Sequence, residues 1–393
     1  MAFIGNQPTA VPLTSSQLAD GLITTDKLAA SAVTSAKILD STIVNADISA
    51  TAAITLNKIS SNPTFRNGII NGDFAVAQRG TSFTSTSSAN NNDTYTLDRF
   101  YILSDGNDII DVTQETSTVP TNQLTAIALD VETINKKFGI AQIIEQKNCV
   151  GLIGNTVTLS FKAKVSSTTK LDNVKCAIVA WSGTADTVTS DIISAWGVEG
   201  TNPTLIANAT YENTPANLSV TTNYATYQVS AAVDTASTKN IIVFIWSDVT
   251  DTTLGDFLFI TDVQLEKGSA ASDFEILPID VDLARCRRYY AKIVTDAAYN
   301  AIGSGFNGTT TAAPAYIKYP ESMRASPTVT QSGLAVHHNA FNVSAVTAIN
   351  AADLGKDTAL VQFAVASGLT VGQAMIITGN NNVNAYIDFS IEL

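Results

Sequence analysis

The sequence has few of the residues that build catalytic and metal centres. It contains two histidines and three cysteines in 393 residues. His337 and His338 are adjacent, so on a strand they would point to opposite faces and could not act together. Cysteines spaced as far apart as Cys149, Cys176 and Cys286 predict neither a disulfide framework nor a zinc site. Phosphate-binding glycine loops are also missing from the sequence.

Charge and long apolar runs are scarce as well. Charged residues make up 15 % of the chain, and the net charge is -13. Such a surface would repel nucleic acid and anionic membranes. The densest basic cluster, 285–288, is too short for a nucleic-acid-binding surface and is better explained as one exposed helix face. No apolar run approaches the roughly 18 residues of a membrane span, and the N-terminus lacks a signal-peptide pattern. We expect synthesis in a cytoplasm and no membrane insertion.

A ten-residue repeat is the clearest positive feature. Each unit has two aliphatic residues five positions apart, as in Ile23-Thr-Thr-Asp-Lys-Leu28. The aliphatic residues that open the units are Leu13, Ile23, Val33, Ile43 and Ile54. So short a unit cannot bury its apolar side alone and must stack on neighbours or on other copies of the chain. We predict an oligomerisation shaft over residues 13–60, because a low-complexity linker would not keep the aliphatic pairs in phase.

Residues 1–12 precede the repeats and are punctuated by Gly5, Pro8 and Pro12. They are too short to form a core. We expect an extended peptide that docks onto another protein, the alternative being a frayed terminus.

The rest of the sequence favours strands and turns. Strand-like segments rich in Val, Ile and Thr, such as Thr156–Val165 and Asn240–Trp246, recur between polar turns without crossover helices. Residues 61–278 therefore predict an antiparallel jelly-roll β-sandwich. A connecting helix is expected over 279–295, where Leu283, Cys286, Tyr290 and Ile293 fall near helical spacing. Residues 296–393 predict a small C-terminal β-sandwich, with one of its strands over His337–Val343. The expected fold class is therefore mainly β.

Several motifs in this order resemble bacteriophage tail-fibre, or receptor-binding, proteins. They are the opening Met-Ala-Phe-Ile-Gly-Asn-Gln-Pro8, the repeats, Asn71-Gly-Asp-Phe-Ala-Val-Ala-Gln-Arg-Gly80 with Tyr95–Phe100, Leu283–Tyr290, and Tyr319–Pro327 with the ending 385–393. The resemblance implies a virion protein that is a homotrimer. Its N-terminal Phe3, Ile4, Gly5 and Pro8 would dock onto a phage tail or adaptor protein, and its β-domains would attach to a host surface glycan or outer-membrane receptor.

The middle module also resembles carbohydrate-binding jelly rolls, through Asn71-Gly-Asp-Phe74 and Thr261-Asp-Val-Gln-Leu265. In those modules acidic residues of the end strands can hold a structural calcium ion. Asp73 and Asp262 are the matching residues here. Ala75 and Thr261 stand where oxygen ligands are often found, and calcium requires six to eight oxygen ligands, so the calcium site is speculative.

Sugar binding needs an aromatic face with planar polar side chains around it. Trp246 lies in an apolar run and is expected in the core. Trp181 and Trp196 lie near turns, so each could be either at the edge of the core or exposed as a platform for a sugar ring. In the C-terminal domain two polar turns could line a site. The candidate glycan-binding residues are Trp181, Trp196, Phe306, Asn307, Asn380, Asn381 and Asn382.

A catalytic pair of carboxylates remains an alternative, because such a pair needs only the right separation in space. The aspartates in question are Asp105, Asp108, Asp111, Asp248, Asp251 and Asp256, and aspartate in polar loops is usually turn chemistry. We therefore expect a non-enzymatic fibre. The rival interpretations are a glycan-degrading or deacetylating tailspike and a purely structural virion adaptor, and the missing signal peptide disfavours a secreted lectin.

Overall fold

The computed structural model describes residues 65–84, 89–235, 237–338 and 342–393, and before them Thr24, Leu28, 32–34, 37–38, Ile43 and 47–48. The chain forms two compact units, residues 1–54 and 55–393. The described residues form 22 strands and two helices, which confirms the mainly β class. Neither of these helices is long and apolar enough to cross a membrane.

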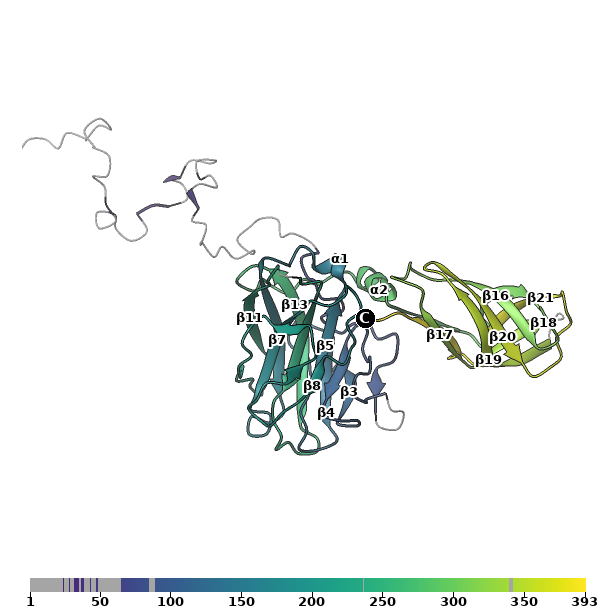
Figure 1. Ribbon diagram of the computed structural model, residues 1–393, viewed down its shortest axis with the longest axis horizontal. Helices are drawn as coiled ribbons and strands as arrows, with labels where there is room; N and C mark the ends of the chain where they lie inside the picture. The colour runs from purple at the N-terminus through teal and green to yellow at the C-terminus, as the bar shows by residue number, and fades with distance from the viewer. Residues whose placement is uncertain are drawn as a thin grey trace, which may run out of the picture. The chain divides into compact units, whose positions relative to one another are not determined.

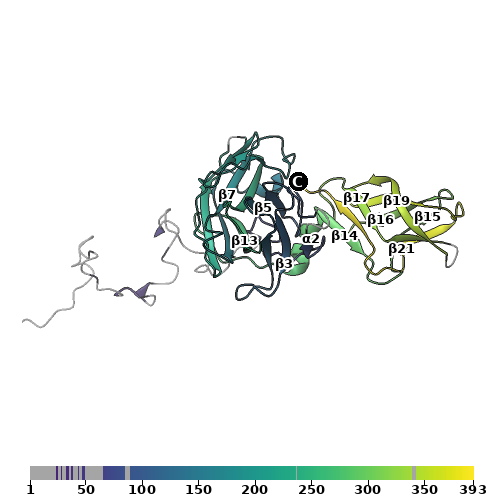
Figure 2. The same ribbon diagram turned by 90° about the horizontal axis from the view of Figure 1, so that it is seen from below.

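Two antiparallel sheets form the larger module, as expected for a β-sandwich (Figure 1). The six-stranded sheet contains, in spatial order, β1 (Ser82–Phe83), β3 (Ile110–Glu115), β4 (Ala126–Val131), β13 (Phe257–Lys267), β6 (Thr156–Val165) and β11 (Ala225–Ala232). The five-stranded sheet contains β10 (Ala209–Tyr211), β7 (Val174–Trp181), β12 (Asn240–Ser247), β5 (Phe138–Ile144) and β2 (Tyr101–Ser104). Figure 2 shows the two layers, with β5 and β7 in one and β3 and β13 in the other.

Both faces of the five-stranded sheet are buried. In β12, residues 241, 243 and 245 pack in the core between the sheets, and residues 242, 244 and 246 pack in a second core on the opposite face. This second core is covered by the connection between β7 and β10, which carries β8 (Ile193–Ala195) and β9 (Thr204–Leu205). Tyr289 and Leu393 also cover it. A strand that is buried on both faces needs a continuous apolar run, which Ile241–Trp246 supplies.

The connecting helix is shorter than the sequence predicted. The connecting helix α2 covers only Ile279–Arg287. The other helix, α1 (Gln146–Cys149), is a single turn within the sandwich. Residues Tyr290–Val294 form strand β14, which pairs with β22 (Tyr386–Ser390), and β17 (Thr328–Ser332) pairs on the other side of β22. The predicted helix over 279–295 is therefore wrong in its second half, because pairing with a strand nearly 100 residues away overrides the local helical spacing.

The remaining strands close into a barrel rather than a two-layered sandwich. In order they are β15 (Ala301–Phe306), β16 (Ala312–Lys318), β20 (Thr358–Val365), β19 (Asn342–Leu354), β18 (Leu334–His338) and β21 (Ala374–Gly379). Inward residues such as Ile317, Val361, Phe363 and Ile377 fill the barrel interior. Closure leaves the barrel without a free sheet edge.

Candidate functional site

A groove crosses the outer face of the six-stranded sheet over β11, β6 and β13. Its floor comes from strand residues that point away from the core, while their neighbours Phe161 and Tyr227 pack toward it. Thr226 pairs with Lys162, and Gln228 pairs with Ser160, so the four side chains form a polar surface. The strands' alternation thus places hydroxyl, amide and ammonium groups side by side. We call this feature the sheet groove.

A β-bulge in β13 brings a carboxylate to the groove. The pairing of β13 with β6 shifts register between Thr261 and Gln264, and Asp262 has a φ of 56°. The extra residue puts both Thr261 and Asp262 between the inward-facing Ile260 and Val263. Asp262 Oδ2 lies 2.8 Å from Lys162 Nζ. A positive φ at a residue other than glycine is costly and is often found at binding sites.

Two segments form the walls of the groove, which has a volume of about 560 Å³. One wall is Thr121–Gln123 of the β3–β4 loop, and the other is 271–276, with the ring of Phe274. A buried network holds the second wall. Glu266 accepts hydrogen bonds from the Ser272 backbone N–H at 2.7 Å and from Gln264 Nε2 at 2.8 Å, and Gln264 Oε1 accepts from the Glu275 backbone N–H at 2.9 Å. Such a network fixes the wall before any ligand arrives.

The two carboxylates predicted for calcium do lie near each other. Burial raises the pKa of Asp262, and the ion pair with Lys162 opposes this rise. Burial also raises the pKa of Asp73, with repulsion from Asp262 as a smaller contribution, while the Ala75 backbone N–H opposes it. The ammonium of Lys162 already supplies a positive partner for Asp262. Among the described residues there is no group of three or more His, Cys, Asp or Glu side chains that could hold a metal ion, so the speculative site gains no further ligand.

Trp181 is not an exposed platform. Its side chain is only 8 % exposed, and its indole N–H donates to the Thr184 carbonyl at 2.9 Å. A Cβ atom added at Gly183 would lie 2.3 Å from the ring, so the chain passes directly over the indole. The prediction of Trp181 as a glycan contact is therefore wrong, because the turn next to it covers the ring instead of exposing it. Trp246 is buried in the second core, as expected.

Trp196 lies half-buried beside that second core, with its ring 5.9 Å from the Phe244 ring in an edge-to-face contact. It begins a loop, 196–202, that a buried charge cluster anchors. Lys137 Nζ donates to the carbonyls of Val198 at 2.7 Å and Thr201 at 2.9 Å. Neither Trp181 nor Trp196 lines the sheet groove.

The buried charge cluster is Lys137, Lys175 and Asp248. Asp248 forms an ion pair with Lys137 and lies 2.6 Å from Lys175 Nζ, and the three side chains are at most 7 % exposed. Lys175 also donates to Asn202 Oδ1 at 2.9 Å. The lysines enter at the starts of β5 and β7, so the cluster ties two strand ends to the loop that carries Trp196.

The other aspartates considered as a catalytic pair also have structural partners. Asp105 and Asp251 form exposed ion pairs with Lys136 and Lys170, at 3.2 Å each. Asn90 Nδ2 donates to Asp108 and Asp111, and Thr253 donates to Asp256. These contacts are turn and loop chemistry of the kind the sequence suggested as the alternative.

The predicted residues of the C-terminal domain are split between surface and core. Phe306 and the Asn380–Asn381 pair are exposed. Asn307 is fully buried, and its side chain donates to the Thr370 carbonyl at 3.1 Å, so its prediction as a glycan contact is wrong. Asn382 is half-buried and accepts a hydrogen bond from the Asn384 N–H at 2.9 Å, which is typical of a turn.

The predicted docking residues Phe3, Ile4, Gly5 and Pro8 lie outside the described residues, as do Leu13, Ile23 and Ile54. Of the described repeat positions, Leu28, Val33, Ile38, Ile43 and Ile48 are 39–56 % exposed in the single chain. In the repeat that opens at Val33, the Thr34 carbonyl accepts a hydrogen bond from the Lys37 backbone N–H at 2.9 Å. Lys37 Nζ donates to the Ala32 carbonyl at 2.6 Å. The oligomeric shaft stays a prediction.

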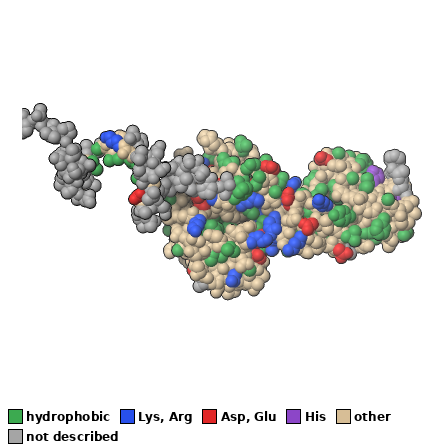
Figure 3. Space-filling model, turned by 90° about the horizontal axis from the view of Figure 1, so that it is seen from above, with side chains coloured by type: hydrophobic (Ala, Val, Ile, Leu, Met, Phe, Trp, Pro, Cys, Tyr) green, Lys and Arg blue, Asp and Glu red, His purple; other side chains and the backbone are tan. Residues whose placement is uncertain are grey.

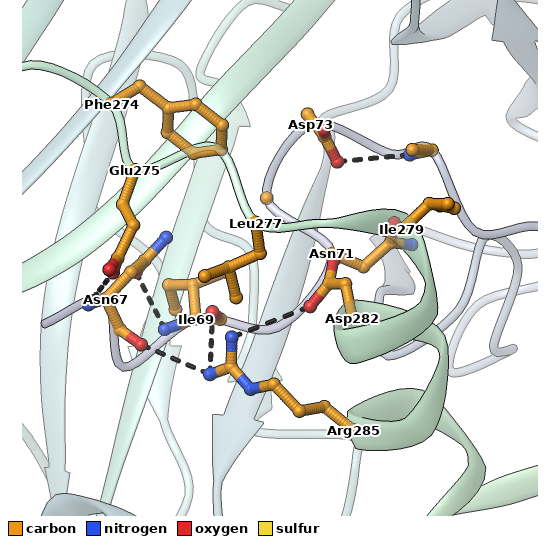
Figure 4. Close-up of a pocket in the computed structure, with 12 residues that line it drawn as sticks. Asn67, Ile69, Asn71, Asp73, Phe274, Glu275, Leu277, Ile279, Asp282 and Arg285 are labelled. Carbon is orange, nitrogen blue, oxygen red and sulfur yellow. Dashed lines mark hydrogen bonds and ion pairs between the residues drawn. The ribbon is translucent and has the colours of Figure 1, made fainter. Parts of the chain in front are cut away.

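A junction close to the groove joins α2 to the first segment of the sandwich (Figure 4). Arg285 donates to the carbonyls of Asn67 at 3.2 Å and Ile69 at 3.3 Å, and its guanidinium lies 3.5 Å from Asp282. Burial raises the pKa of Asp282 to about 6, Arg285 opposes the rise, and Asp73 adds to it.

Replacing Asp282 with asparagine is expected to raise the free energy of unfolding at pH 7 by about 1–2 kcal/mol. The pKa in the folded chain, about 6, lies above that in the unfolded chain, so the folded state holds an extra proton between about pH 4 and pH 6. Stability therefore falls as the pH rises through this window. Urea unfolding at pH 5 and pH 7 should show this fall in the wild type and a smaller fall in the variant.

The matched control is Asp280→Asn, an exposed position on the same helix, which should change stability by no more than about 0.5 kcal/mol. Equal pH dependence in the wild type and Asp282→Asn would show that Asp282 titrates normally.

The chain matches no protein-family model, and no curated protein sequence matches it. Among solved structures it is similar to the enzymatically active domain of tailspike protein 4 of bacteriophage CBA120, with 15 % identity over 52 % of this chain and 22 % of that chain, at a TM-score of 0.30. It is also similar to TmCBM61 in complex with β-1,4-galactotriose, with 13 % identity over 52 % of this chain and 99 % of that chain, at a TM-score of 0.27. A family 16 carbohydrate-binding module has 14 % identity over 40 % of this chain and 86 % of that chain, at a TM-score of 0.25. TM-scores this low do not establish a shared fold, so no ligand or activity transfers from these proteins.

Proposed function

We propose that this chain is a homotrimeric bacteriophage tail fibre that binds a host surface glycan in the sheet groove without cleaving it. In this proposal the N-terminal peptide attaches to the tail, the repeats trimerise, and the β-modules face the host. The protein is made in the host cytoplasm and functions in the virion.

The observation that carries the proposal is the chemistry of the sheet groove. Its lining combines the amides of Asn122, Gln123 and Gln228 with the hydroxyls of Thr226 and Ser272. A sugar presents many hydroxyl groups that both donate and accept hydrogen bonds, and amides and hydroxyls match both roles. The Phe274 ring offers an apolar surface for the C–H face of a pyranose. A concave site with a few convergent polar groups is the usual form of a small-ligand site.

The fibre role is supported by the sequence motifs and by the repeat positions. Aliphatic side chains exposed at regular spacing in one chain need another surface to cover them, and further copies of the same repeat provide it. Three weak glycan sites on one shaft would bind a cell surface far more tightly than one site alone.

Replacing Thr226 with phenylalanine tests the site. Thr226 is exposed on β11 and lines the groove, so an aromatic ring there should fill the groove and weaken glycan binding at least about tenfold, or 1.4 kcal/mol. The measurement is calorimetric titration of the full-length protein with a panel of bacterial surface oligosaccharides. β-propensity favours phenylalanine in a strand, so the fold should persist.

Ala232→Phe is the matched control, because Ala232 is exposed on the same strand but does not line the groove. It should bind like the wild type. Unchanged affinity of Thr226→Phe for an oligosaccharide that the wild type binds would move the site elsewhere. If the wild type binds no member of the panel, the receptor is not one of these glycans.

A further inference from the structure

A second pocket lies between α2, strand β14 and the first segment of the sandwich. One face of α2 forms one wall, residues 75–78 form the opposite wall, and the outer side of β14 completes it. Figure 2 shows α2 and β14 side by side. The pocket has a volume of about 330 Å³, which is within the usual range for a ligand site. We call it the edge pocket. Apart from residues 75–78, its lining residues are Ile279, Leu283, Arg287, Lys292 and Val294.

Strand β14 has an open edge at this pocket. It is the end strand of the three-stranded sheet and pairs only with β22. The Tyr289 carbonyl accepts a hydrogen bond from the Ile391 N–H at 2.8 Å, so residues 289, 291 and 293 turn their backbone groups toward β22. The alternate residues Tyr290, Lys292 and Val294 therefore turn their N–H and C=O groups away from β22, toward the edge.

One of these outward groups already has a partner. Gln78 Nε2 donates to the Tyr290 carbonyl at 2.8 Å. No described residue donates to or accepts from the outward backbone groups of Lys292 and Val294. An unpaired strand edge is a template for an extended segment of another chain, and here the open stretch lies inside a pocket.

The charges of the edge pocket favour an acidic occupant. Its two charged side chains, Arg287 and Lys292, are both positive, in a chain with a net charge of -13. Neither forms an ion pair with a described residue. Arg287 Nε is buried without an acceptor in the described part of the chain, and Lys292 Nζ lies 4.2 Å from the centre of the Tyr386 ring. Figure 3 shows Lys and Arg side chains close together where the sandwich meets the C-terminal module. A carboxylate in the pocket would give both cations an acceptor.

The other lining side chains favour a peptide over a sugar. The only uncharged polar one is Gln78, and its amide already donates to Asp98 at 2.6 Å and to the Tyr290 carbonyl. The rest are apolar, and two of them, Ile279 and Val294, are 57 % and 44 % exposed. A sugar needs polar partners for its many hydroxyl groups. An extended peptide instead supplies aliphatic side chains and a backbone that pairs with the strand edge.

We propose that the edge pocket binds an extended acidic peptide segment of a second protein, which adds to β14 as a further strand. The peptide backbone pairs with Lys292 and Val294, and its Glu or Asp side chain binds between Arg287 and Lys292. Its aliphatic side chains cover Ile279 and Val294. The edge pocket shares no lining residue with the sheet groove, so this proposal is independent of glycan binding.

An array of random short peptides, probed with the labelled full-length protein, tests this site. Bound peptides should be enriched in glutamate or aspartate alternating with valine or isoleucine. A synthetic copy of the best peptide then gives the affinity by fluorescence polarisation. Only every second amide of an added strand faces β14, so N-methylation of that set should weaken binding at least about tenfold. N-methylation of the other set should change it little.

Two protein variants test the backbone and the charges separately. Val294→Pro removes one outward N–H and keeps the neighbouring pairs with β22, and it should weaken peptide binding at least about tenfold. Its matched control, Val294→Ala, keeps the N–H and should weaken binding no more than about threefold. Arg287→Glu should also weaken binding at least about tenfold, whereas Lys318→Glu, at an exposed lysine outside the pocket, should not. Circular dichroism melting checks the fold of each variant.

Each outcome decides the proposal. Selection of acidic peptides, with loss of binding in Arg287→Glu and in one methylated set, supports it even if Val294→Pro does not fold. An array without acidic enrichment, or unchanged binding in Arg287→Glu, contradicts it. Equal binding of both methylated sets would identify a site for a small anion instead of an added strand. Host polysaccharide binding should be the same in all the folded variants, and its loss in Arg287→Glu would make the pocket part of the glycan site.

Discussion

Replacing Asp248 with asparagine is expected to lower the free energy of unfolding by about 3–5 kcal/mol. The substitution keeps the shape of the side chain but leaves Lys137 and Lys175 buried without a negative partner. Breaking one member of a buried ion-pair network costs far more than the network contributes as a whole, since an uncompensated charge remains. Urea unfolding followed by tryptophan fluorescence measures the loss.

Asp251→Asn provides the comparison in the same loop region. Asp251 pairs with Lys170 at 3.2 Å, but both side chains are more than a third exposed, so its loss should cost no more than about 1 kcal/mol. The loop 196–202 should also become sensitive to proteolysis in Asp248→Asn only, because Lys137 and Lys175 anchor it. Similar losses in the two variants would show that the buried cluster is not important for stability.

Substituting aspartate for Ile23, Val33 and Ile43 together is expected to abolish the oligomeric shaft and leave the sandwich folded. Val33 and Ile43 are 56 % and 55 % exposed in the single chain, so aspartate there costs a monomer little. In an oligomer the same positions would be covered, and three carboxylates per chain would be buried together. Light scattering gives the mass, and the thermal unfolding transition of the sandwich gives the control.

Aspartate at the neighbouring exposed Thr24 and Thr34 should leave the oligomer intact. A triple variant that keeps its mass would show that the repeats do not assemble the protein. Assembly would then have to come from the C-terminal barrel.

The strands of the sandwich could be predicted because they are bounded by turn residues and have strong β-propensity. The segment predicted over 156–165 agrees with β6, and the Asn240–Trp246 run lies within β12. Tyr290 and Ile293 of β14 were assigned to the helix instead, because their spacing is helical. Only the partner strand β22, with the register Tyr290 to Ser390 and Ile293 to Ile387, reveals the strand.

A second error of this kind occurs in the barrel. The sequence predicts one strand over His337–Val343, but His337 and Val343 face each other across the β18–β19 pair. The predicted segment therefore contains the ends of two paired strands, β18 and β19, rather than one strand. His337 and His338 nevertheless point to opposite faces, as expected: His338 is buried and His337 is half-buried.

The sheet groove could not be found from the sequence, although Asp262 was singled out for another reason. Its floor and walls come from segments near residues 122, 161, 227, 262 and 273, which only the sheet pairing brings together. The bulge that turns Asp262 outward also leaves no sequence mark, because the residue that adopts the positive φ is not a glycine. The sequence does contain a weak signal of a polar outer face. Polar residues alternate with apolar or aromatic ones along both strands, at positions 158, 160 and 162 of β6 and 226, 228 and 230 of β11.

The most direct test of glycan binding without cleavage is size-exclusion chromatography of intact bacterial surface polysaccharide mixed with the purified full-length protein. We predict that the protein elutes together with the polysaccharide, and that the polysaccharide keeps its size on long incubation. The release of shorter oligosaccharides would identify a glycan-degrading tailspike. If the protein is mixed with the polysaccharide of its own host and the two elute separately, the protein does not bind that glycan. A structural role in the virion would then be the better explanation.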